Sequence, residues 1–274
     1  IGLVGSEMCI RDRLEKGLSL AQNIDKIFFA KNGKLSNEFN LLYASLFKSP
    51  EQYIDVVTAL GRKKVGMTRE EIMTAIDKPS NGTLSKVLDE LEYCGFIRKY
   101  SGYGKKTKQA IYQLVDNYTL FYFKFIQQNK NNDEHFWSVS IDSATHRAWS
   151  GLAFERLCMA HIQQIKAGLG ISGVLSNIYS WRKEADENGN GAQIDLLIDR
   201  NDHVINVCEM KYSMSEFTID ADYERELRNK KSVFIETTKT RKAVHLTMVT
   251  TYGVRQNSHS GVVQSEITLE DLFG

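Results

Sequence analysis

Two consecutive apolar runs, joined by a short polar turn, constrain the second half of this chain more than any other feature. Residues 193–199 (QIDLLID) and 203–212 (HVINVCEMKY) each have the length and apolar content of a β-strand. The residues between them, 200–202 (Arg-Asn-Asp), have the composition of a turn. Strands separated by so short a turn pair with each other, so the sequence predicts an antiparallel hairpin here.

Other elements surround this hairpin in a regular order. The apolar spacing predicts a long helix at about 147–167, strands at 173–181, 243–250 and 262–265, a charged helix at about 221–231, and a final short helix capped by Thr268. The order helix, strands, helix, strand, strand favours a mixed sheet with helices on both faces.

The first half contains a second pattern, at residues 51–115. Three short helices are predicted; Thr68 and Glu71 form a capping box at the start of the second, and Ser80 caps the third. Two strand-like runs follow, at 96–100 and 110–114, joined by the turn SGYGKKTKQ. Three helices ending in a hairpin predict a winged helix-turn-helix.

The remaining segments complete the expected domain plan. Residues 1–13 (IGLVGSEMCIRDR) resemble translated sequencing-adaptor sequence and lack the pattern of a signal peptide. We expect 14–50 to be a helical remnant of an upstream module, 51–115 the winged helix, 116–146 a linker helix and loop, and 147–274 a second domain. The polar stretch 129–135 is the expected boundary loop.

The composition limits which binding partners and which cellular compartment are expected for this chain. A length of 274 residues suits about two domains. The net charge of +1 means that nucleic-acid binding would need a local basic patch. The four cysteines lie far apart, which argues against a disulfide framework or a zinc site and favours the cytoplasm. The apolar runs are shorter than the ~20 residues of a membrane-spanning helix, so no membrane partner is expected.

The charged residues of the central hairpin form the candidate site. Strand side chains alternate between faces, so Glu209 and Lys211 share a face, and hairpin pairing can bring Asp195 beside Glu209. Two carboxylates at the ends of adjacent strands offer the oxygen ligands that Mg²⁺ or Mn²⁺ prefers. A lysine beside them can stabilise charge that develops on a phosphate. The alternative is that these residues only pair across strands or face solvent.

A third carboxylate fits the same site. Glu155 lies on the long predicted helix, in a stripe whose other members, Leu152, Met159 and Ile162, are apolar. Because a carboxylate on a core-facing stripe is costly unless a cation or donor meets it, we expect Glu155 to point toward the metal.

With these residues identified, residues 149–273 resemble the PD-(D/E)XK restriction-endonuclease-like nucleases, in which a helix Glu, a strand Asp and a following E-x-K form the site. The resemblance implies an α/β/α fold and phosphodiester hydrolysis. The residues that it implies are Asp195, Glu209 and Glu155 as metal ligands, Lys211 as the catalytic lysine and Gln193 as a helper. Ile194 stands where the family often has Pro.

From about Leu18 the chain also resembles the C-terminal part of prokaryotic, archaeal-type AAA/STAND-like ATPases, which carry a winged helix before this nuclease-like domain. The stretches that support this resemblance are NIDKIFFAKNGKLSNEFNLLYASLFKSPEQY, ELEYCGFIRKY, FYFKFI, WSGLAFERLCMAHI and CEMKYS. It implies an upstream ATPase module, of which 14–50 would be the remnant. The string G-Y-G-K-K-T at 102–107 lies in the hairpin turn and has Lys99 where a phosphate-binding loop has its first Gly. We therefore expect no ATP binding by this fragment.

Basic residues of the predicted winged helix are the candidate nucleic-acid contacts. The hairpin contains Arg98, Lys99, Lys105, Lys106 and Lys108 and no acidic residue between positions 95 and 115, with three interleaved tyrosines (100, 103 and 112). The third helix adds Ser85 and Lys86, beside Asn81 and Thr83. Such a surface can follow phosphates without reading sequence. The alternatives are a solvated hairpin and a winged helix that docks on protein.

The overall expectation is a cytoplasmic, Mg²⁺-dependent nuclease with DNA as partner and an ATPase module upstream. The main alternative is a catalytically silent regulatory or interaction module that uses the nuclease fold as a scaffold. A third possibility is a transcription regulator, which would bind duplex DNA sequence-specifically at moderate salt.

Overall fold

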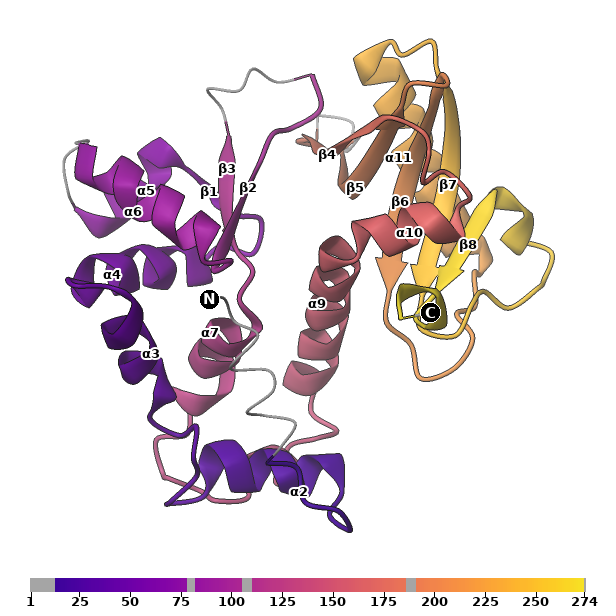
Figure 1. Ribbon diagram of the computed structural model, residues 1–274. Coiled ribbons are helices and arrows are strands. Elements are labelled where there is room, and N and C mark those ends of the chain that lie inside the picture. The colour runs from indigo at the N-terminus through magenta and orange to yellow at the C-terminus, as the bar shows by residue number, and fades with distance from the viewer. Residues whose placement is uncertain (1–12, 78–81, 105–109, 186–190, 274) are drawn as a thin grey trace. The chain divides into compact units, whose positions relative to one another are not determined.

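The computed structural model describes residues 13–77, 82–104, 110–185 and 191–273 (Figure 1). The chain divides into two compact units, one of residues 1–99 and 110–146 and the other of residues 100–109 and 147–274. Both units combine helices with a sheet, so the fold class is α+β. Within the described ranges, no helix has the length and apolarity needed to cross a bilayer. The predictions for Ser80, Asn81, Lys105, Lys106 and Lys108 fall outside these ranges.

The first unit is built mainly from short helices. These are α2 (Leu20–Ile24), the π-helix η1 (Asp25–Phe29), α3 (Glu38–Leu46), α4 (Pro50–Gly61), α5 (Arg69–Ile76), α6 (Gly82–Tyr93), α7 (Asn117–Phe121), the π-helix η3 (Tyr122–Ile126) and α8 (Phe136–Val139). A three-stranded sheet of β1 (Met67–Thr68), β2 (Ile97–Tyr100) and β3 (Ile111–Leu114) has the order β1-β3-β2.

Two details of the first unit confirm the sequence reasoning, and one was missed. Thr68 Oγ1 accepts a hydrogen bond from Glu71 N at 3.2 Å, and Thr68 N donates to Glu71 Oε2 at 2.8 Å, which completes the capping box of α5. The apolar stripe of α6 is buried. Strand β1 was missed because a two-residue strand is too short for an alternating pattern; its pairing with β3 joins Met67 to Tyr112.

The second unit contains a sheet and three α-helices within its described residues. Its elements are α9 (Ala144–Ala160, which begins in the first unit), α10 (Ile162–Gly168), β4 (Ser176–Lys183), β5 (Ala192–Arg200), β6 (Val204–Lys211), α11 (Ala221–Thr238), β7 (Ala243–Thr250), the 3-10 helix η4 (Ser260–Val262), β8 (Ser265–Thr268) and the 3-10 helix η5 (Glu270–Leu272).

Several predicted boundaries in this unit were wrong. The helix expected at 147–167 is interrupted at His161, whose Nδ1 bonds to the carbonyl oxygen of Leu157 at 2.8 Å. Helix α11 runs seven residues beyond Lys231, because Val233 and Phe234 continue its buried face. The strand expected at 262–265 starts only at Ser265 and runs to Thr268, because Val262 still belongs to the 3-10 helix η4.

The five strands of the second unit form a mixed sheet in the order β4-β5-β6-β7-β8. The pairs β4–β5 and β5–β6 are antiparallel, whereas β6–β7 and β7–β8 are parallel. The predicted central hairpin is thus confirmed as β5 and β6, with Leu196 opposite Cys208 and Asp199 opposite Ile205. The mixed sheet is confirmed as well.

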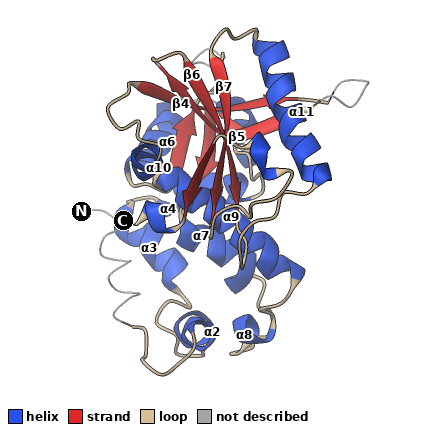
Figure 2. Cartoon of the chain, turned by 90° about the vertical axis from the view of Figure 1, so that its right-hand side faces the viewer, coloured by secondary structure: helices blue, strands red, loops and turns tan. Residues whose placement is uncertain are grey.

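Helices cover both faces of this sheet, as predicted (Figure 2). On one face, α11 packs Leu227 and Phe234 against strand residues that include Leu197 and Val207. On the other face, α9 and α10 pack against the alternate strand residues, among them Leu196, Ile198, Cys208 and Met210. The α11 face also contains Tyr103, whose ring centroid lies 5.4 Å from that of Phe234.

Candidate functional site

The C-terminal end of β6 carries the candidate site on its α11 side. Cys208 and Met210 belong to the cluster packed against α9 and α10. The side chains between and after them, Glu209 and Lys211, therefore project toward α11. The predicted sharing of a face by Glu209 and Lys211 is confirmed, with an Nζ–Oε1 distance of 3.1 Å between them.

Glu209 is held by three donors, two of which come from α11. Lys230 Nζ lies 2.9 Å from Glu209 Oε2, and Tyr223 Oη donates to Glu209 Oε1 at 3.0 Å. Lys211 contacts the same Oε1 atom. The side chains of Glu209 and Lys230 are only 13% and 16% exposed, so this network is largely shielded from water. We call Glu209, Lys211, Tyr223 and Lys230 the β6–α11 cluster.

Burial and charge act in opposite directions on this cluster. Burial raises the pKa of Glu209, but the charges and hydrogen bonds of Lys230 and Lys211 outweigh it, and the net pKa is lowered. Burial lowers the pKa of Lys230, but the Glu209 carboxylate reverses that effect and the net pKa is raised. Burial and the neighbouring Glu209 charge both raise the pKa of Tyr223. Glu209 and Lys230 are thus both charged at neutral pH, and Tyr223 stays a neutral donor.

The sequence reasoning missed Lys230 and Tyr223, although a signal was present. The buried face of α11 follows the positions Tyr223, Leu227, Lys230 and Phe234, spaced at i, i+4, i+7 and i+11. A lysine at a position where the helical period requires an apolar residue indicates a buried partner of opposite charge.

Asp195 sits at a distortion of β5. The residue pairs Tyr179–Leu197 and Trp181–Ile194 are two positions apart along β4 but three positions apart along β5. Strand β5 therefore contains one extra residue, which is a β-bulge. Ile194 and Leu197 accordingly share the α11-side cluster, which regular alternation would forbid. Alternation therefore does not fix the side on which Asp195 lies.

Asp195 has one hydrogen-bond partner within the described part of the chain. Gln193 Nε2 donates to Asp195 Oδ1 at 2.7 Å, so the predicted helper does meet Asp195. Leu196 and Cys208 form the last residue pair between β5 and β6 on the side away from the hairpin turn. Asp195 and Glu209 are the next residue on each strand beyond that pair.

Glu155 lies on α9, the helix of the opposite face. The buried residues of that helix within the second unit are Phe154 and Cys158, whereas Glu155 and the other members of its predicted stripe are half-buried. Across the described ranges, no group of three or more His, Cys, Asp or Glu residues is arranged to hold a metal ion. The three predicted carboxylates are thus not gathered around one point.

The donor chemistry nevertheless fits a divalent cation. Carboxylate oxygens are the ligands that Mg²⁺ and Mn²⁺ prefer, and Glu209 is kept ionised by its neighbours. Oδ2 of Asp195 has no hydrogen-bond partner among the residues that the structure describes. Both oxygens of Glu209, however, already contact ammonium groups. An ion on Glu209 would therefore have to replace one of these ammonium contacts.

The predicted nucleic-acid residues of the first unit differ in their availability. Ser85 Oγ accepts a hydrogen bond from Arg69 Nη1 at 2.7 Å, and Arg98 Nε donates to Gln113 Oε1 at 2.7 Å. Lys86 and Lys99 are exposed. Lys86 lies 3.8 Å from Glu90, and the Lys99 ammonium lies 5.6 Å from the centre of the Tyr112 ring. Among the predicted contacts that the structure describes, Lys86 and Lys99 are therefore the two exposed cations that could meet phosphates.

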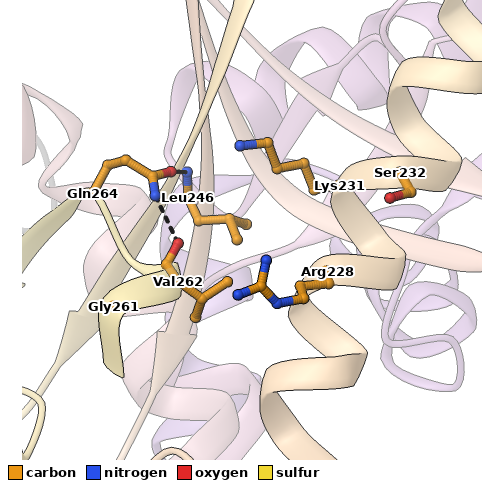
Figure 3. Close-up of a pocket in the computed structure, with 7 residues that line it drawn as sticks. All are labelled: Arg228, Lys231, Ser232, Leu246, Gly261, Val262 and Gln264. Carbon is orange, nitrogen blue, oxygen red and sulfur yellow. Dashed lines mark hydrogen bonds between the residues drawn. The ribbon is translucent and has the colours of Figure 1, made fainter. Parts of the chain in front are cut away.

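A separate pocket of about 260 Å³ lies beside α11 (Figure 3). Arg228 and Lys231 of α11 line it, together with Leu246 of β7 and the η4 segment. The Gln264 side chain, also at this pocket, bonds to the backbone of Leu246 and Val262 at 2.8 and 2.7 Å. None of the residues of the β6–α11 cluster lines this pocket, so it is distinct from the candidate site.

Comparison of the chain with protein-family models, with curated proteins and with solved structures found no match.

Proposed function

We propose that the second unit hydrolyses phosphodiester bonds of nucleic acid with the help of Mg²⁺ or Mn²⁺. The observation that carries this proposal is the position of Glu209 at the end of β6, with the Lys211 ammonium 3.1 Å away on the same face. The chain order also supports it. Glu155 lies on a helix before the strands, Asp195 on β5, and Glu209 and Lys211 on β6, which is the order of elements that the resemblance implies.

The residues have distinct roles in this proposal. Glu209 and Asp195 would hold the cation, and Gln193 orients Asp195 through its hydrogen bond. A bound cation would supply a more acidic water and neutralise charge on the phosphate. The Lys211 side chain is 36% exposed, so its ammonium can reach a substrate phosphate and stabilise the charge that develops there.

A nicking assay on supercoiled plasmid DNA, with single-stranded RNA in parallel, tests this proposal. We expect cleavage with Mg²⁺ or Mn²⁺ that EDTA abolishes, and a loss of about 10²–10³-fold in Asp195→Asn and in Lys211→Met. Asp202→Asn and Lys231→Met change the same residue types in the same unit outside the cluster, and should retain activity. Undiminished cleavage by both site variants would remove these residues from the reaction.

A second candidate function is a non-catalytic interaction module, and one observation favours it. Both oxygens of Glu209 already have partners in Lys211, Lys230 and Tyr223, so the cluster is complete as a purely structural network. Calorimetry that detects no Mg²⁺ or Mn²⁺ binding, together with inactive but folded protein, would support this module over the nuclease.

We further propose, from the sequence resemblance, that the first unit contains a winged helix that binds DNA. The exposed Lys86 and Lys99 support this role. We also propose, from the same resemblance, that the chain is the C-terminal part of an ATPase-family protein. The cysteine spacing favours a cytoplasmic location, and the departures from a phosphate-binding loop at residues 99–107 favour no ATP binding by this fragment.

The salt dependence of DNA binding tests the winged-helix proposal. Replacing Lys86 and Lys99 together with glutamine should weaken binding and reduce the slope of log K against log salt by about 2, because each phosphate contact contributes about 0.9. The matched control is Lys31→Gln with Lys34→Gln, two exposed lysines outside the predicted winged helix. Equal slopes for both double variants would contradict a phosphate contact at Lys86 and Lys99.

A further inference from the structure

Lys230 bridges two carboxylates of different exposure. Its Nζ lies 2.9 Å from Glu209 Oε2 and 3.0 Å from Glu226 Oε1. The Glu209 side chain is 13% exposed, whereas that of Glu226, one helical turn before Lys230, is 51% exposed. The ammonium therefore already contacts a second, solvent-facing partner to which it can move without becoming unpaired.

We propose that the Lys230 ammonium occupies the cation position of the β6–α11 cluster, so that a divalent ion binds Glu209 only after Lys230 has moved over to Glu226. This inference rests on the proposed function, and it assigns to Lys230 a positioning role that the E-x-K pattern does not contain. Lys230 competes with the ion for the same oxygen of Glu209.

The distances make joint occupancy unfavourable. An ion of this class binds carboxylate oxygens at roughly 2.1 Å, so an ion on Glu209 Oε2 would lie within a few ångströms of an ammonium 2.9 Å from the same oxygen. Like charges that close repel strongly in a poorly hydrated site. The Lys211 ammonium lies 3.1 Å from Oε1, so it can stay when Oε2 is vacated.

Calorimetric titration of the full chain with Mg²⁺ and with Mn²⁺ tests the competition directly. Lys230→Met should bind either ion at least tenfold more tightly than the unmodified protein. Glu226→Gln should bind more weakly, because the displaced ammonium loses its second partner. Lys231→Met removes the same positive charge one residue further along α11. Its ion affinity should therefore rise much less than that of Lys230→Met. Glu209→Gln should lose binding.

Thermal unfolding provides a readout that does not depend on activity. Mn²⁺ should raise the Tm of Lys230→Met more than that of the unmodified protein. If Lys230→Met does not fold by circular dichroism, Lys230→Gln tests the same step, because its neutral amide can still donate to Glu209.

The outcomes separate this inference from the proposed function. Equal ion affinity in the unmodified protein and in Lys230→Met overturns the competition while leaving the metal site intact. An equal gain in ion affinity in Lys231→Met also overturns the competition, because the gain would then follow from the loss of any nearby positive charge. The absence of ion binding in every variant overturns both the metal site and the competition.

Discussion

Replacing Phe234 with alanine is expected to lower the free energy of unfolding of the second unit by about 3–5 kcal/mol. Phe234 is fully buried, and its ring meets Trp181 edge-on, with centroids 5.2 Å apart. Truncating it removes apolar burial and leaves a cavity between α11 and the sheet, which the surrounding side chains fill only in part. Urea unfolding followed by circular dichroism measures the loss.

The neighbouring residue provides the control for this prediction. Ile235 is 36% exposed and does not belong to the α11-side cluster, so Ile235→Ala should change the unfolding free energy far less. A loss below about 1 kcal/mol in Phe234→Ala would contradict the packing of α11 on this face. Because Phe234 lies one turn after Lys230, loosening it should also release the Lys230–Glu209 contact.

The architecture of the second unit was predictable where local chemistry decides it. The 200–202 turn and the apolar runs beside it were sufficient for the β5–β6 hairpin, and the alternation of strand side chains placed Glu209 and Lys211 on one face. Helix ends were less predictable. The break at His161 and the extension of α11 to Thr238 depend on which side chains the sheet buries.

The site was predictable only in part, because two of its features depend on distant partners. The bulge in β5 becomes visible only through the pairing of Ile194 and Leu197 with β4, so the sequence alone could not reveal the distortion beside Asp195. Lys230 lies 21 residues after Glu209, and their contact depends on how α11 packs. The position of Lys230 on the apolar stripe could nevertheless be recognised from the sequence.

Replacing Glu209 with alanine is expected to cost about 3 kcal/mol of unfolding free energy at pH 7. The change leaves Lys230, 16% exposed, without its buried carboxylate, and leaves the Tyr223 hydroxyl without its acceptor. The cost lies toward the lower end for a broken buried pair, because Glu226 still contacts Lys230. Urea unfolding of the variant and of the unmodified protein at several pH values measures it.

The pH profile follows from the two shifted groups. The pKa of Glu209 is lowered in the folded protein, so its contribution is complete above its ordinary value of about 4.3 and is lost as the pH falls through the folded value. The pKa of Lys230 is raised, so its contribution is complete below about 10.4 and is lost as the pH rises through its folded value. The difference in unfolding free energy between Glu209→Ala and the unmodified protein should therefore be constant from about pH 5 to 10 and decrease below and above that range.

The double variant Glu209→Ala/Lys230→Met decides whether the two residues act as a pair. In the double variant no buried lysine is left without its carboxylate. Its loss of unfolding free energy should therefore be at least 1 kcal/mol smaller than the sum of the losses in the two single variants. Glu209→Ala with Lys231→Met serves as the matched control, and its losses should add, because Lys231 has no ion pair with Glu209. Additive losses in both double variants would mean that Lys230 and Glu209 are not coupled, and the β6–α11 cluster would then lack the contact on which the ion competition depends.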